Sequence, residues 1–225
     1  MGVWSIDLDS STVDSSFNDV SVVGPFGYGG FVVFQFWSHP VETLSSFLFH
    51  DNRIKATGGY EDGIWVLDFG PVNEAGKMGD FVISDNEITV EPSENGPAYA
   101  GVEAAFTEGT IISNNRIVGS SLMGIAVGGA SQCMVKANNV EKVTAEWAAI
   151  GLLTLNIGTD EKPILVPTSD STVVGFGNKT NVYADPEAYG NILVGVNSMQ
   201  GNPPGPAIRD AMKRKMEMIK SMRKF

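Results

Sequence analysis

The chain has 225 residues, 43% hydrophobic and 18% charged, which supports one substantial domain or at most two small ones and excludes a disordered polymer. Its net charge is −11, but residues 207–225 hold seven basic and two acidic side chains (+5), which leaves −16 on residues 1–206. So acidic a body argues against nucleic acid as a partner.

The N-terminal sequence and the single cysteine exclude several other classes. MGVWSIDLDSS lacks the basic and apolar segments of a secretory signal, so none is predicted, and a secreted protein is expected only if a leader has been removed. The longest apolar stretch, from Val22 to Trp37, is broken by Pro25 and by glycines, so it predicts no membrane span. Cys133 is alone and there are two histidines, so neither an intramolecular disulfide nor a metal site is predicted. The compartment stays open.

A motif built on one asparagine recurs along the chain. Its pattern is apolar, x, apolar, x, x, Asn, x, apolar, and its copies centre on Asn52, Asn86, Asn115 and Asn138, with a weaker copy at Asn18. The alternating apolar residues predict short strands. We expect each asparagine to form a tight corner, both by adopting left-handed backbone angles and by bonding its amide to the asparagine of the next copy.

A second motif follows each asparagine after a variable gap. It reads small residue, apolar, x, apolar, and it begins at Gly30, Gly63, Gly101, Gly124 and Ala149, with a further copy expected at Asn191. The asparagine spacings of 34, 29 and 23 residues vary too much for helical repeats, which hold their period. Two alternating motifs of this kind predict a coil of short strands whose corners accept insertions.

The Asn-x-Ile corners and Gly-Ile-x-Val strands resemble the right-handed parallel β-helix of the pectin-lyase-like superfamily, over about residues 13–155 with an extension to 197. The resemblance implies an all-β, single-stranded right-handed parallel β-helix of about six coils over residues 1–200. A Pro/Gly linker and a basic C-terminal helix are expected over residues 201–225. The resemblance implies little about activity, because the superfamily includes lyases, glycosidases, esterases, adhesins and catalytically silent members.

Arg53-Ile54-Lys55 matches a triplet found in polygalacturonases, but the Gly-His-Gly and paired-aspartate motifs of that family are missing. We interpret Arg53 as one member of an exposed column of alternating charge, each ion pair contributing about 0–1 kcal/mol. The column comprises the residues that follow each asparagine: Asp19, Arg53, Glu87, Arg116 and Asn139.

The middle residue of the second motif forms a column that faces outward, with Trp65 beside Glu103. An exposed Trp65 could stack on a sugar ring while Glu103 accepts hydrogen bonds from hydroxyl groups. The alternative is that Trp65 packs beneath a loop and that the acids are merely solvated. The whole column is Val32, Trp65, Glu103, Ala126, Gly151 and Leu193, and the bordering loops add the substrate-binding candidates Tyr60, Glu61, Asp62 and Tyr99.

Three functions fit these features. The first is a non-catalytic module that binds carbohydrate or another surface through the outward sheet. The second is a polysaccharide hydrolase that uses Glu103 with a neighbouring acid such as Asp68. A lyase fits less well, because it needs a base, and Ca²⁺ would have to neutralise the uronate; no other cofactor is expected. The third is a structural protein that assembles with further copies.

Residues 206–224 are predicted to form an amphipathic helix that begins at Pro206, a favoured first helical residue. Its apolar side is Ile208, Ala211, Met212, Ile219 and Met222. The helix could cover an open end of the coil, where free strand edges invite aggregation, or lie along one sheet. We expect it to pack against the acidic body or a second copy in preference to a membrane.

Overall fold

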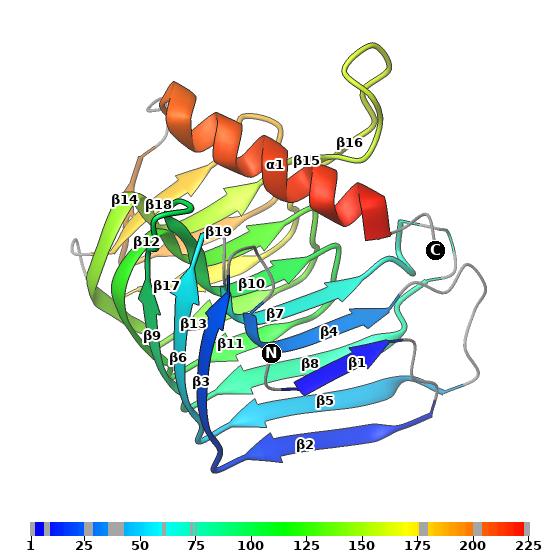
Figure 1. Ribbon diagram of the computed structural model, residues 1–225. Helices are drawn as coiled ribbons and strands as arrows, with labels where there is room; N and C mark the ends of the chain where they lie inside the picture. Colours follow the sequence, from blue (N-terminus) through cyan, green and yellow to red (C-terminus); the bar gives the residue numbers. More distant parts are fainter. Residues whose placement is uncertain are drawn as a thin grey trace.

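Short parallel strands stack in three ribbons, and one helix follows them (Figure 1). The computed structural model describes residues 3–6, 10–24, 29–35, 43–59, 62–72, 74, 76–175, 180–199 and 204–222. Side chains are described for all of these residues except 3–6, 141–146, 207 and 222.

The first ribbon is a seven-stranded parallel sheet, where the sequence predicts about six coils. Its strands, in stacking order, are β2 (Thr12–Ser16), β5 (Ser45–His50), β8 (Gly79–Ser84), β11 (Ile111–Ser113), β13 (Met134–Lys136), β17 (Thr172–Val174) and β19 (Ile192–Val194). The second ribbon stacks β3 (Asp19–Gly24), β6 (Arg53–Gly58) and β9 (Glu87–Glu91) on the first parts of β12 (Arg116–Gly128) and β14 (Asn139–Leu153).

The third ribbon contains the remaining parallel strands. They are β1 (Val3–Ile6), β4 (Gly29–Gln35), β7 (Asp62–Asp68), β10 (Ala98–Ala105), the later parts of β12 and β14, β18 (Asn181–Ala184) and β20 (Asn197–Ser198). The chain visits the three ribbons in the same order several times, as β2–β3–β4, β5–β6–β7 and β8–β9–β10. This parallel, all-β topology is compatible with the β-helix that the repeats predict. An antiparallel pair, β15 (Leu155–Asn156) and β16 (Leu165–Val166), interrupts it.

The predicted asparagine ladder is confirmed at the corner between the first two ribbons. The Asn86 Oδ1 accepts the main-chain N–H of Asn52 at 3.1 Å and its side-chain amide at 2.9 Å, and the same pattern joins the other neighbouring copies. The left-handed backbone, however, belongs to the residue before each asparagine. Those residues are Phe17, Asp51, Asp85, Asn114 and Ala137, with φ between 54° and 58°. The asparagine therefore satisfies the corner's polar groups, and its neighbour makes the bend.

The small residue of the second motif is required by the isoleucine of the first. A Cβ added to Gly63 would lie 2.4 Å from Ile88 Cγ2 and 2.5 Å from the Gly101 carbonyl oxygen. Gly30, Gly101 and Gly124 meet the equivalent side chain of the same column, at 2.5, 2.3 and 3.1 Å. The two motifs thus interlock, which explains why they recur together.

Two apolar cores lie on opposite faces of the third ribbon. One fills the space between the ribbons and takes alternate residues such as Ile64 and Val66 of β7. The other lies on the outer face, where Trp65 and Leu67 of the same strand pack beneath the helix. β7 is therefore buried on both faces, whereas a strand of a solvent-exposed sheet would be buried on one face only.

Helix α1 (Pro206–Met222) begins at the predicted residue and lies across the outer face of the third ribbon (Figure 1). Of the two predicted positions, an open end of the coil or one sheet, the helix therefore takes the sheet. Ala211, Met216 and Ile219 enter the outer core. Among the described residues no helix combines the length and apolarity needed to span a bilayer.

Candidate functional site

The outward column on the third ribbon is confirmed by the strand register. Trp65 of β7 pairs with Glu103 of β10, and Val32, Ala126 and Gly151 continue the same row on the neighbouring strands. The last member is different. Tyr183 of β18 pairs with Gly151, whereas Leu193 lies on β19 in the first ribbon, opposite Val173, so its predicted place in the column is wrong.

Of the two interpretations of this column, the one with an exposed Trp65 is not the one that the structure has. Trp65 is 0% exposed and Glu103 is 3% exposed, because α1 covers them. Trp65 does pack beneath another segment, as the alternative interpretation has it, but that segment is the C-terminal helix. The acid next to it is buried and not solvated. The groove that would admit a sugar ring is therefore filled by the chain itself.

Lys215 of α1 occupies the centre of the covered face. Its Nζ contacts the Asp62 Oδ2, lies 3.2 Å from the Glu103 Oε2, and stands 3.7 Å from the centre of a Trp65 ring. The side chain is 2% exposed. We call Asp62, Trp65, Tyr99, Glu103 and Lys215 the buried lysine cluster.

The remaining cluster members come from β7 and β10. Asp62 also accepts the main-chain N–H of Ala100 on its Oδ1 at 3.1 Å, which fixes its carboxyl group between the two strands. The Tyr99 ring lies 5.1 Å from Lys215 Nζ, so the ammonium group faces two aromatic rings and two carboxyl groups. Four predicted site residues thus converge. Tyr60 and Glu61, also predicted there, lie outside the described residues.

Asp68 lies apart from this cluster, at the end of β7. Its Oδ1 accepts the N–H of Gly70 at 2.9 Å, and its Oδ2 accepts those of Met78 and Gly79 at 2.9 and 3.0 Å. It therefore holds the connection between β7 and β8. Burial raises the pKa of Asp68 to about 6, more than these hydrogen bonds lower it. The structure does not bring Asp68 together with Glu103 as a carboxylate pair.

Burial and charge act in opposite directions on the cluster. Desolvation raises the pKa of Asp62 well above its ordinary range, although the attraction of Lys215 lowers it. Desolvation also raises the pKa of Glu103, against the same cation. For Lys215, burial lowers the pKa, but the attraction of both acids outweighs burial and raises it overall. Burial therefore favours the neutral forms of both acids, and Lys215 opposes burial by favouring their ionised forms.

Two polar atoms of the cluster have no hydrogen-bond partner within the described part of the chain. They are Trp65 Nε1 and Glu103 Oε2, both fully enclosed. Glu103 Oε2 lies close enough to Lys215 Nζ for an ion pair, but the two groups are not aligned as donor and acceptor. Unpaired buried polar atoms are uncommon and mark sites of strain or chemistry.

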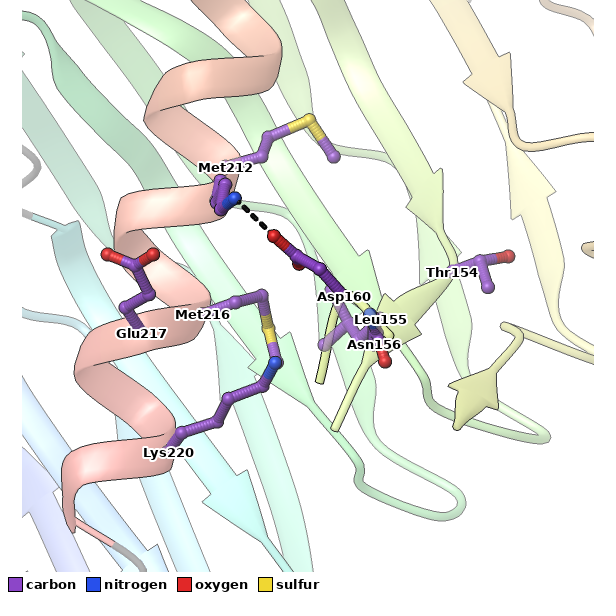
Figure 2. A pocket seen from close by; sticks show the side chains of 9 residues that line it. Thr154, Leu155, Asn156, Asp160, Met212, Met216, Glu217 and Lys220 are labelled. Atoms are coloured by element: carbon purple, nitrogen blue, oxygen red, sulfur yellow. Dashed lines mark hydrogen bonds and ion pairs between the residues drawn. The ribbon is translucent and has the colours of Figure 1, made fainter. Parts of the chain in front are cut away.

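A clamp on the rim of the helix holds it over the cluster. Lys213 pairs with Asp160 of the β15–β16 connection at 2.7 Å, and Lys220 donates to the Gly158 carbonyl oxygen. A cavity of about 220 Å³ lies between this connection and α1, with Asp160 pointing toward the helix (Figure 2). Its walls include Thr154, Asn156, Met212, Met216 and Glu217.

Lys215 is the site residue that the sequence analysis missed. Its signal lies in the helix pattern, because residue 215 follows Ile208 by seven positions and precedes Ile219 by four. Those spacings put it in the middle of the apolar stripe. A lysine in an apolar stripe that packs on a sheet needs a buried acidic partner, since an unpaired buried charge is strongly destabilising.

The charged column on the second ribbon is confirmed as an exposed ladder. Arg53 lies 3.9 Å from Asp19 and 3.5 Å from Glu87, and Arg116 pairs with Glu87 from the other side. This supports the structural interpretation of Arg53. Cys133 is buried in the inner core.

Within the described ranges, no three His, Cys, Asp or Glu side chains gather in a way that could hold a metal ion. Comparison of the chain with family models, with curated proteins and with solved structures finds no match in any of the three.

Proposed function

We propose that the chain is a non-catalytic module of the right-handed parallel β-helix class, related in architecture to the pectin-lyase-like superfamily, whose outward sheet binds another surface. The surface it binds is helix α1. The observation that carries this proposal is the burial of Lys215 between Asp62, Glu103 and the two aromatic rings of the same sheet.

Charge and shape both support this choice. The tail that contains α1 is +5 and the remainder of the chain is −16, so the helix is attracted to the sheet that it covers. The apolar side chains of α1 enter the outer core, and Lys215 on the same side meets the two acids of the cluster. A docked helix of this kind gives a structural module with a closed face.

The carbohydrate and hydrolase hypotheses are less well supported. Both need Trp65 or Glu103 to reach a sugar, and both side chains lie beneath α1. The hydrolase further needs a second carboxylate, but Asp68 is used in the β7–β8 connection and Asp62 is bound to Lys215. Either function requires the helix to leave.

A glycan panel tests the proposal. We expect that the full chain shows no binding or cleavage of neutral or acidic polysaccharides that depends on Trp65 or Glu103. Glu103→Gln is compared with Glu87→Gln, which changes an exposed acid of the charged ladder. Hydrolysis that is lost in Glu103→Gln, retained in Glu87→Gln and accompanied by an unchanged circular dichroism spectrum would overturn the non-catalytic assignment.

Limited proteolysis tests the binding itself. Trypsin can cut α1 after Arg214 and Lys220 only when the helix leaves the sheet. We expect Lys215→Met to speed cleavage there, and Lys213→Met, which changes the exposed partner of Asp160, to have a much smaller effect. Equal cleavage rates in the two variants would contradict a helix held through Lys215.

A further inference from the structure

The buried lysine cluster brings together the three groups needed to make an amide bond. Lys215 supplies an amine nitrogen in contact with the Asp62 carboxyl group, and Glu103 lies 3.2 Å from the same nitrogen. Because both carboxyl groups approach the same nitrogen, Asp62 and Glu103 also lie close to each other. All three are at most 4% exposed, and the rings of Trp65 and Tyr99 enclose them.

We propose that Lys215 and Asp62 become joined by an isopeptide bond, formed by the folded protein itself, with Glu103 as the catalytic residue that transfers protons. The bond is an amide between Lys215 Nζ and Asp62 Cγ. This inference rests on the proposed docking of α1, because Lys215 meets Asp62 and Glu103 only while the helix covers the sheet; proteolysis tests the docking and the intact mass tests the bond. It assigns Asp62, Glu103 and Lys215 a role in covalent self-modification.

The starting protonation state favours the reaction. Asp62 is in direct contact with the lysine nitrogen, and burial raises its pKa, which favours the neutral carboxyl group that the reaction needs. Glu103 is then the ionised acid, and it can accept a proton from the Lys215 ammonium group. The two acids thus have different roles because of their surroundings, one as electrophile and one as base.

The steps balance as a condensation. Glu103 takes one proton from the ammonium group, and the lone pair of Nζ then forms a bond to Asp62 Cγ. The C–O bond to the Asp62 hydroxyl breaks, and that oxygen leaves as water after receiving a proton. Of the four hydrogens on Lys215 Nζ and Asp62, one stays on the amide nitrogen, two leave in water and one remains on Glu103. No oxidant or reductant is needed.

Burial supplies both the rate and the direction. Two groups held in contact react with effective concentrations of about 10⁵–10⁸ M when they are well oriented. In water, hydration of the separate ammonium and carboxylate ions favours hydrolysis, but an enclosed site removes that hydration. The product amide is neutral and suits the apolar surroundings better than the ion pair that it replaces.

The intact mass of the purified, folded full chain tests the proposal. We expect it to fall short of the mass calculated from the sequence, with or without the first methionine, by the mass of one water molecule. Trypsin should release residues 56–77 joined to residues 215–220, because a lysine in an amide bond is not cleaved. A folded chain with its full calculated mass would overturn the proposal.

Two variants test whether a loss of water comes from this bond. Asp62 is followed by Gly63, a sequence that can also lose water by forming a succinimide. Lys215→Arg removes the amine but retains Asp62 and Gly63, so we expect it to have the full mass, and a persistent loss of water would contradict the bond. Asp62→Ala should also have the full mass.

Glu103→Gln keeps the size of the side chain but cannot accept the proton. We expect the bond to form at least about 100-fold more slowly in this variant, the usual effect of losing general acid–base catalysis. Complete joining at the wild-type rate would overturn the role of Glu103. If Glu103→Gln does not fold, Glu103→Met, which is apolar, similar in size and also unable to accept the proton, provides the same test.

Discussion

Asn86 stands in the middle of the asparagine ladder, and replacing it with alanine tests whether the ladder holds the three ribbons together. Its Oδ1 is the acceptor for the main-chain N–H and side-chain amide of Asn52, and its own amide donates to the carbonyl oxygen of Phe49. In Asn86→Ala the side-chain amide of Asn52 still donates to the Ser15 carbonyl oxygen. The main-chain N–H of Asn52 and the carbonyl oxygen of Phe49, however, each lose the hydrogen bond to Asn86.

The expected cost follows from those two groups. A buried donor or acceptor left without its partner costs about 1–3 kcal/mol, so the free energy of unfolding should fall by about 4 kcal/mol. Asn18→Ala is the matched control, because Asn18 lies at the exposed end of the same ladder. Water can replace the bonds of its side chain, so we expect it to cost about 1 kcal/mol or less.

Urea denaturation followed by circular dichroism measures both values. The slope of free energy against urea should stay unchanged in both variants, because the surface exposed on unfolding is the same. Similar midpoints for Asn86→Ala and Asn18→Ala would refute the reasoning, since the buried and exposed ends of the ladder would then be equivalent.

Three further predictions concern the packing of the ribbons, the helix and the acids. Gly63→Ala should lower the free energy of unfolding by about 1–3 kcal/mol, because the added Cβ would lie 2.4 Å from Ile88. Gly205→Ala, whose added Cβ would meet no described atom within 4 Å, should change it by less than about 0.5 kcal/mol, and equal urea midpoints for the two variants would contradict this. Lys215→Met should cost about 3–5 kcal/mol, because both buried acids lose their partner, whether Lys215 is joined to Asp62 or paired with it as an ion. The urea midpoint should move far less in Lys213→Met, and the reverse order would place Lys215 outside the core. The folded pKa of Asp68, about 6, exceeds its ordinary value of 3.8, so its contribution to stability is complete below about pH 4 and is lost as the pH rises through 6. Between pH 4 and 7 the wild-type free energy of unfolding should therefore fall by up to about 3 kcal/mol relative to Asp68→Asn, and parallel pH profiles would show that Asp68 does not titrate in this way.

The ribbons could be predicted because each repeated residue satisfies a local physical requirement. Asn86 pairs the polar groups of the corner, and Gly63 leaves room for Ile88 in the next copy. Such requirements recur with every coil, so the sequence shows them as a pattern. Where the pattern is interrupted, prediction failed. The β15–β16 connection separates β14 from β18, and Tyr183 could not be recognised as the residue that follows Gly151.

The candidate site was only half predictable, for a different reason. Trp65 and Glu103 were found because they share a repeat position, and the register confirms that they are neighbours. Their burial depends on Lys215, which is separated from Asp62 by 153 positions and belongs to no repeat. A lysine in a basic helix is ordinarily a solvated residue. Only the packing of α1 on the third ribbon shows that this one has two acids beneath it.

Amide hydrogen exchange of the full chain, followed by mass spectrometry, tests the central claim most directly. If α1 is held on the outward sheet by the buried lysine cluster, the amides of residues 210–222, beyond the first helical turn, should exchange as slowly as those of β7 and β10, through opening of the whole domain. If α1 exchanges at the rate of a free peptide while β7 and β10 stay protected, the outward sheet is open and the buried lysine cluster does not hold the helix.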